Sequence, residues 1–386
     1  MAGFLIYYSY QYIFPFVRFD LQNGSLKLSV YDLPGYIATM ISNIKYNIHY
    51  KGKYNCIIFP ILVILLATCS TVKNIKISVL VPAQVNIPGN VKKLSLISRI
   101  YPENITGSLD SLNNLQLNPE ENYYSLSSEC LYAVSDVLKV SPRFEQIKIA
   151  GNYAGIDNIH YPGPSIQKAE VREKCESDST DALLSLEYFK LNDSIRYSME
   201  IFDIHIIDYT IFTTTAWKIY YPGNFSVTQS FVLKDTLVWL GTGSTDGRAV
   251  NDLPSVGNMI IKSFNKAGTD CGKLIAPYWV NEINRFYYTS GNKNFRLAKK
   301  FAREEDWNNA AELWNPLTNN PNNNIAAKAA FNMALACELQ DRIDLAIMWI
   351  EKSDSLLKDP RTQIYRNILK SRLEGNKVLD NQLNSN

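Results

Sequence analysis

The spacing of apolar residues changes near Asn292, and this change divides the sequence into two kinds of structure. Upstream, apolar and polar residues alternate in several runs, as at Ile195, Tyr197, Met199 and Ile201. Alternation places every second side chain on the same face, which is typical of a strand with one buried face. Downstream, apolar residues recur at three- and four-residue steps, which predicts helices. We therefore expect an α+β domain, with a mixed or antiparallel sheet and flanking helices, followed by an all-α domain.

Turn residues and apolar periods set the elements that we expect in the upstream part. They predict a helix over residues 125–138 and a turn at Pro222-Gly223-Asn224. The remaining expected elements are a hairpin of strands 225–233 and 236–240 turning at Lys234-Asp235, helices over 254–267 and 270–281, and a last short strand over 283–288.

The helical part repeats with a period of 36 residues, because Ala310 aligns with Ala346 and Ala298 with Ala334. Two helices that cross closely need small residues at the crossing, and these alanines supply them. The pattern resembles the tetratricopeptide repeat, whose period is about 34 residues, although the usual glycine before the turn is absent. The resemblance implies a tetratricopeptide-like domain, and plain helical hairpins without repeat identity are the alternative.

The same resemblance implies a binding surface, since the first helix of each tetratricopeptide pair lines a concave groove. The groove positions that we assign to a protein partner are Phe295, Lys299, Arg303, Lys328, Phe331 and Glu338. The three cations among them would form a local basic patch able to hold a carboxylate. A solvated helix face is the alternative, because lysine is common on exposed helix faces.

An apolar stretch at residues 56–67 follows three lysines and constrains where the chain is located. A basic segment, an apolar core and small residues at the end are typical of a secretory signal peptide. The core has 12 residues, fewer than the roughly 20 of a membrane-spanning helix. Leu66-Ala67-Thr68-Cys69 resembles a bacterial lipobox, which implies cleavage before Cys69 and a diacylglycerol on its thiol. A buried element of a core is the alternative.

The position of this signal determines the domain organisation that we expect. A signal peptide normally begins the chain, so we expect translation to start at Met40 and residues 1–39 to be a mis-annotated extension. An extension that is removed with the signal is the alternative. The expected parts are the extension at 1–39, a lipoprotein signal peptide at 40–68, the α+β domain at 69–291 and the tetratricopeptide-like domain at 292–386.

Composition and motifs argue against several classes of function. The chain has 39 basic and 37 acidic residues, so nothing indicates a nucleic-acid partner. Downstream of the signal the histidines are His160 and His205, and no cysteine pair has metal-site spacing. We therefore assign no metal, no cofactor and no catalytic residue. A disulfide between Cys175 and Cys271 is left open.

Short motifs along the chain downstream of the signal resemble a family of uncharacterised Bacteroidetes lipoproteins with tetratricopeptide-like C-terminal helices. Among them are Val81-Pro82-Ala83, Ser141-Pro142-Arg143-Phe144, Ile275-Ala276-Pro277-Tyr278-Trp279 and the segment 307–314. That family has no assigned activity that could be carried over to this chain.

The architecture and the resemblance together favour a non-enzymatic binding or assembly protein of the cell envelope. Acylated Cys69 would hold it in the bilayer of the outer membrane or of another envelope membrane, and the repeat groove would bind a protein partner. No acidic run follows Cys69, so we expect the protein to face the periplasm. A glycan-binding protein or a cell-wall hydrolase is the alternative, which leaves enzymatic activity open.

Overall fold

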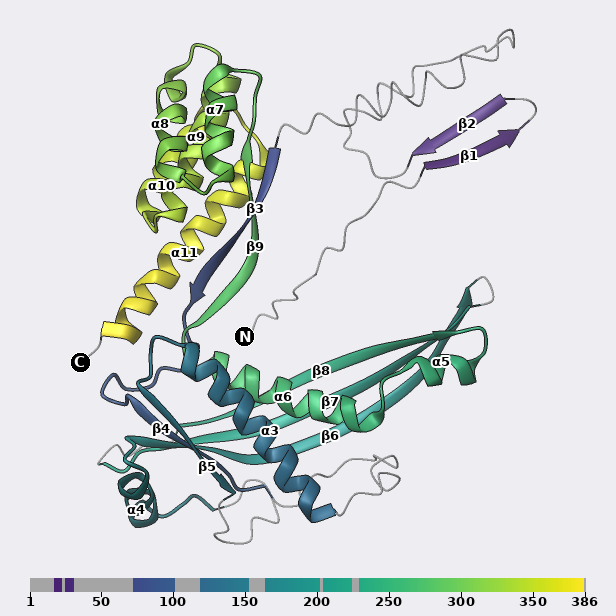
Figure 1. Cartoon of the computed structure of the whole chain (residues 1–386), viewed down its shortest axis with the longest axis vertical. Helices are drawn as coiled ribbons and strands as arrows, with labels where there is room; N and C mark the ends of the chain where they lie inside the picture. Colours follow the sequence, from purple (N-terminus) through teal and green to yellow (C-terminus); the bar gives the residue numbers. More distant parts are fainter. Residues whose placement is uncertain are drawn as a thin grey trace. The chain divides into compact units, whose positions relative to one another are not determined.

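The computed structural model describes residues 17–22, 25–30, 72–100, 119–152, 164–201, 204–223 and 229–384. The chain divides into two compact units, Met1–Ser70 and Thr71–Asn386. In the first unit, β1 (Val17–Gln22) pairs antiparallel with β2 (Ser25–Val30) (Figure 1). The apolar stretch at 56–67 and Cys69 lie outside the described residues.

A five-stranded mixed sheet in the order β5-β4-β6-β7-β8 forms the centre of the second unit. Strand β4 (Lys93–Ser98) pairs in parallel with β5 (Gln146–Asn152) and with β6 (Ala182–Ile201). Strands β6, β7 (Ile204–Tyr220) and β8 (Gln229–Gly243) continue as an antiparallel meander. This sheet and its helices confirm the predicted α+β fold.

Helices α3 (Pro119–Val140) and α6 (Val256–Ile275) pack on each other and against the sheet (Figure 1). Their apolar sides share one buried core with the strands, in which Phe189 stacks on Phe264 with ring centroids 3.7 Å apart. Helix α4 (Lys168–Asp178) packs on a smaller cluster that includes Ile97 and Leu183. These two residues neighbour core residues along their strands, so α4 covers the opposite face. The short helix α5 (Asp246–Asp252) follows β8.

Two element breaks predicted from the sequence are wrong. Strand β8 continues through Lys234 and Asp235, where we expected a hairpin, and its pairing with β7 is unbroken. Lys266 of α6 binds the Asp235 carboxylate there at 2.8 Å. Helix α6 likewise continues through Gly268, where we expected two helices. A Cβ at this glycine would lie 2.1 Å from the carbonyl oxygen of Cys130, so Gly268 permits the close approach of α3 and does not end the helix.

Strands β3 (Val72–Val81) and β9 (Tyr278–Tyr288) form a separate antiparallel ribbon of two strands (Figure 1). The chain then enters a layer of helices, which confirms the predicted all-helical C-terminal region. They are α7 (Lys293–Arg303), α8 (Trp307–Trp314), α9 (Asn323–Leu339), α10 (Ile343–Leu356) and α11 (Pro360–Asn384), with a 3₁₀ helix at Asn315–Asn319 before α9.

The described cysteines carry free thiols, and the disulfide that the sequence left open is not formed. Cys175 lies in the cluster beneath α4, whereas Cys271 lies in the core between α6 and the sheet. Burial raises the pKa of the Cys175 thiol to about 11, which makes it unreactive at neutral pH. Among the described residues, no helix is long and apolar enough to cross a membrane.

Candidate functional site

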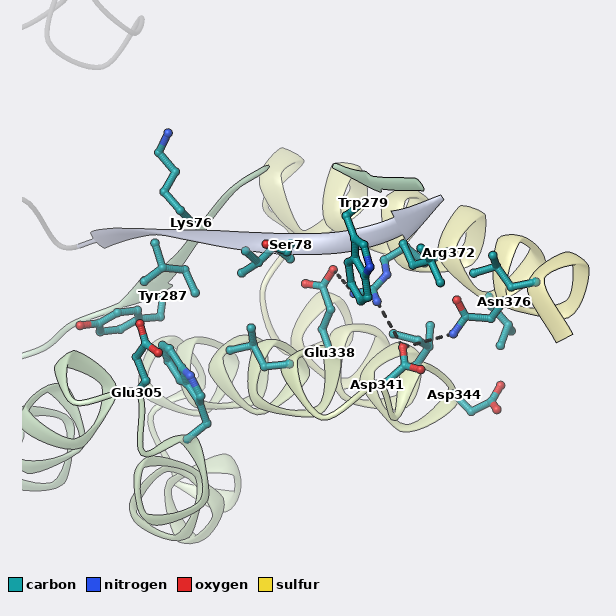
Figure 2. A pocket seen from close by; sticks show the side chains of 18 of the residues that line it. Lys76, Ser78, Trp279, Tyr287, Glu305, Glu338, Asp341, Asp344, Arg372 and Asn376 are labelled. Atoms are coloured by element: carbon teal, nitrogen blue, oxygen red, sulfur yellow. Dashed lines mark hydrogen bonds and ion pairs between the residues drawn. The ribbon is translucent and has the colours of Figure 1, made fainter. Parts of the chain in front are cut away.

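A groove of about 1280 Å³ lies between the β3/β9 ribbon and the helical layer (Figure 2). Strand β3 forms one wall together with Trp279 and Tyr287 of β9. The helical side consists of the ends of α7 and α9, the starts of α8 and α10, and one side of α11. Small-molecule sites usually measure about 300–1000 Å³. This groove is therefore large enough for a segment of polypeptide. The residues that α11 contributes recur at helical spacing, and they are Arg372, Leu373, Asn376, Lys377, Leu379, Asp380 and Leu383.

Two side-chain amides hold the ribbon, one at each of its ends. Asn332 of α9 accepts a hydrogen bond from the N–H of Tyr288 at 2.7 Å and donates to the Tyr288 carbonyl at 2.8 Å. Gln382 of α11 accepts from the N–H of Ala83 at 3.0 Å and donates to the Ala83 carbonyl at 2.9 Å. Each amide pairs one backbone donor and one acceptor that would otherwise lose water without compensation. The helices therefore bind an extended part of their own chain.

Between the two amides, the buried carboxylate of Glu338 joins the ribbon to α11. Its Oε1 accepts from Arg285 of β9 at 2.9 Å and from Arg372 of α11 at 2.8 Å. The Tyr365 hydroxyl donates to Oε2 at 2.5 Å. Burial by itself would raise the pKa of this carboxyl, but the two guanidinium groups and the hydroxyl outweigh burial and lower the pKa. Glu338 therefore remains ionised and bonded, which suits a structural joint and not a general acid.

Aromatic residues of β9 pack against helices on both faces of the strand. Tyr287 lies against Trp307 and Trp314, with ring centroids 6.2 and 6.0 Å apart. On the opposite face, Phe286 and Tyr288 lie 4.8 and 5.0 Å from Phe331. Successive side chains of a strand point to opposite faces, so the end of β9 is inserted into the helical layer. Further along the ribbon, Trp279 is 52% exposed and points into the groove (Figure 2).

Two family models match parts of the chain. Residues 91–288 match the model of a family described as Domain of unknown function (DUF8603), and they make up more than half of the chain. The chain belongs to this family. Residues 296–371 match a second model, described as Domain of unknown function (DUF6340). The DUF8603 match ends with β9 and the DUF6340 match lies within α7 to α11, so the groove has walls from both regions.

One similar solved structure is the crystal structure of a neuraminyllactose-binding hemagglutinin homolog from Helicobacter pylori. It is 11% identical in sequence, and the alignment covers 49% of this DUF8603 chain and 82% of that chain, with a TM-score of 0.24. No curated protein matches the chain.

The six groove residues predicted from the sequence have different positions in the structure. Phe295 and Phe331 are each 1% exposed, so the expectation that they line an open surface is wrong. The physical reason is that aromatic side chains of β9 already cover Phe331, and Phe295 lies in the same core. Glu338 and Arg303 do line the groove, although Glu338 is sealed by its partners.

The two lysines of the predicted basic patch do not line this groove. Lys328 is half-buried, and its ammonium group lies 5.8 Å from the centre of the Tyr288 ring. Lys299 is half-buried on α7. The binding of a carboxylate by Lys299, Arg303 and Lys328 stays a prediction.

Sequence reasoning missed the two amides that hold the ribbon. Asn332 stands among alanines and apolar residues within α9. Asparagine is a poor residue for a helix interior because it competes for backbone hydrogen bonds, so its position there was a usable signal. Gln382 gave no comparable signal, since glutamine is common on helices.

Proposed function

We propose that this chain is a non-enzymatic binding protein of the cell envelope, anchored by lipid at Cys69, which captures an extended segment of a protein partner in the groove. The observation that carries the proposal is the open groove of about 1280 Å³ beside a ribbon that the same helices already hold by backbone-directed amides. A helical layer that binds one extended segment has the chemistry to bind another.

The buried alanines support a tetratricopeptide-like identity for the helical layer. Ala298, Ala310, Ala334 and Ala346 are each 0% exposed in the core of this layer. This is the environment that the 36-residue register requires at the helix crossings. The hairpins α7/α8 and α9/α10, followed by α11 as a cap, then correspond to two repeats and a capping helix.

The location of α7 supports attachment to a membrane. Val72 begins the described part of the second unit three residues after Cys69, a span of about 10 Å at most. Val72 pairs with Tyr288, which is followed within five residues by α7. That helix carries Lys293, Arg296, Lys299, Lys300 and Arg303, and each cation near an anionic bilayer contributes about 1 kcal/mol of attraction.

The positions of exposed aromatic residues support the glycan-binding alternative less well than the protein-binding proposal. Among the described residues, the strongly exposed aromatic side chains are Tyr132, Tyr197, Phe212 and Trp279. They lie on α3, β6, β7 and β9, so they do not form the flat row that would stack on a glycan chain.

Photocrosslinking in intact cells tests the proposal with a matched pair of positions. Trp279 in the groove and Tyr132 on α3 are 52% and 55% exposed. A benzoylphenylalanine placed at 279 should yield a discrete adduct with a protein, whereas the same group at 132 should not. Identical adducts from both positions, or none from 279, would reject the groove as the binding site.

A further inference from the structure

The wall that β3 gives to the groove is the edge of the strand. Six consecutive residues of β3, from Lys73 to Ser78, line the groove. A strand that presents one face lines a cavity with every second residue only, because successive side chains point to opposite faces. Figure 2 agrees, since the Lys76 side chain points away from the helices while its strand borders the groove.

The backbone along this edge has unused hydrogen-bonding capacity. Among the described strands, β3 pairs with β9 alone, in a sheet of two strands. In an antiparallel pair, alternate residues direct their N–H and C=O groups toward the partner and the others direct them outward. For Lys73 to Leu80, no described residue outside β9 forms a hydrogen bond with these backbone groups. An edge of this kind is a template for a further strand.

The groove offers apolar contacts opposite the edge and opposite charges at its two ends. Leu339, Ile343, Leu373 and Leu379 lie on the helical walls. Near the start of β3, Lys73 lines the groove together with Arg303 and Glu305. The carboxylates of Asp341 and Asp344 lie toward the end of β3 (Figure 2). Asp380 precedes by two residues Gln382, whose amide binds Ala83 just beyond β3. Of these three carboxylates, Asp341 binds Arg372 at 3.2 Å, and neither Asp344 nor Asp380 has an ion pair among the described residues.

We propose that the partner segment binds as a third strand along the free edge of β3, with a basic residue at its end beside Asp344 and Asp380. This inference rests on the proposed function, because it specifies how the groove holds its partner. The lining run of six residues corresponds to a strand of about 20 Å. Main-chain hydrogen bonds would supply affinity, and the apolar wall and charged end would select the sequence.

A phage-displayed library of random twelve-residue peptides is selected on the full-length protein. This experiment tests whether the groove binds peptides and whether they bind as a third strand. We expect selected peptides with apolar residues at every second position and a basic residue at one end. The selected peptide is then synthesised with a single N-methyl group at each position in turn. Methylation of alternate residues should weaken binding about tenfold or more, and methylation of the residues between them should have little effect.

The outcomes separate the binding mode from the function. If no peptide is selected, the proposed function fails together with this inference. If peptides bind but N-methylation acts equally at all positions, or at none, the groove binds peptides and the third-strand mode is rejected. Concentration-dependent protection of β3 amides from hydrogen exchange without peptide would instead identify a second copy as the occupant, which overturns the inference.

A charge reversal tests the orientation with a matched control. The double variant Asp344→Lys and Asp380→Lys should replace basic by acidic residues at the end of the selected peptides. Glu351→Lys, on α10 outside the groove and 51% exposed at its side chain, should leave the selection unchanged. Peptides that keep their basic end in the double variant would refute this orientation.

Discussion

Glu338 is an ionised side chain that folding removes from water, so its stability depends on the groups around it. The carboxylate is fully buried and accepts from Arg285, Arg372 and Tyr365. Removing one member of such a cluster leaves other charges buried without compensation, which typically costs about 3–5 kcal/mol. We expect Glu338→Gln to lower the free energy of unfolding by that amount at pH 7, measured by urea denaturation.

The effect should also depend on pH. Because the pKa of Glu338 is lower in the folded than in the unfolded state, the unfolded state binds the proton more readily. The stabilisation is therefore complete above the ordinary glutamate pKa of about 4.3 and is lost as the pH falls through the lower folded value. The difference in the free energy of unfolding between wild type and Glu338→Gln should therefore become smaller as the pH falls below about 4.3.

Asp341 provides a control for this prediction because it shares Arg372 with Glu338. Its side chain is 69% exposed, and exposed ion pairs contribute about 0–1 kcal/mol. Asp341→Asn should therefore change stability by less than about 1 kcal/mol. An equal loss from both variants would contradict the role given to burial.

Asn332 makes a second residue-scale prediction. Replacing it by alanine leaves the buried N–H and C=O of Tyr288 unpaired, at about 1–3 kcal/mol for each group. Asn332→Ala should lower the urea midpoint markedly, whereas Asn324→Ala, on the exposed first turn of the same helix, should not. If Asn332→Ala keeps the urea midpoint of the wild type, water must bond to the Tyr288 backbone groups in place of the amide.

Residue-level roles in the groove were only partly predictable from the sequence. The repeat register assigned Arg303 and Glu338 to the groove side of the helices, and both residues line the groove that the structure describes. It gave no indication that Phe331 would be covered, because the covering residues Phe286 and Tyr288 belong to a strand outside the repeat. A local period reports which side of a helix is apolar, and it does not identify what packs there.

At the scale of elements, the crossing of α3 and α6 yields a prediction with opposite signs at two glycines. Alanine favours a helix over glycine by about 1 kcal/mol. At Gly268, however, the new Cβ would meet the backbone oxygen of Cys130 at 2.1 Å, and such overpacking costs about 1–3 kcal/mol or more. Gly268→Ala should therefore be net destabilising in thermal unfolding.

Gly247 in α5 is the matched control, since nothing lies within 4 Å of the position that a Cβ would take. Gly247→Ala should be neutral or should stabilise by up to about 1 kcal/mol. If both variants behave alike, the close packing of α3 on α6 is not what limits residue 268.

The elements themselves were largely predictable, and their ends were less so. Alternation revealed the second half of β6, and helical periods revealed α3 and the first part of α6. Polar residues within β8 and a glycine within α6 resembled the ends of elements. The sequence does not show that Asp235 binds Lys266 or that Gly268 faces a neighbouring helix. Tertiary contacts override the local signals of turns.

At the scale of the whole molecule, the fold class followed from the change of period, but the ribbon did not. Strands β3 and β9 are separated by nearly 200 residues, and each looks like an ordinary short strand. Their pairing joins the part before the five-stranded sheet to the part after it, and the resulting free edge is what gives the groove its proposed chemistry. The division of domains at residue 291 stays a prediction.

Anchoring through Cys69 is the prediction that places the molecule in the cell. A single acyl chain binds a bilayer only reversibly, so stable attachment requires two or more chains, as on a lipidated cysteine. Cys69→Ala should therefore release the protein to the soluble fraction after cell lysis.

Cys56→Ala is the control, because Cys56 belongs to the segment that cleavage before Cys69 would remove. This variant should remain in the membrane fraction after a high-salt wash. The salt screens ionic attraction and would release a protein that is held at the membrane only by the basic residues of α7. Retention of Cys69→Ala after the same wash would contradict acylation at this residue. Digestion of the anchored protein by a protease added to intact cells would contradict the periplasmic orientation, since the protease does not cross the outer membrane.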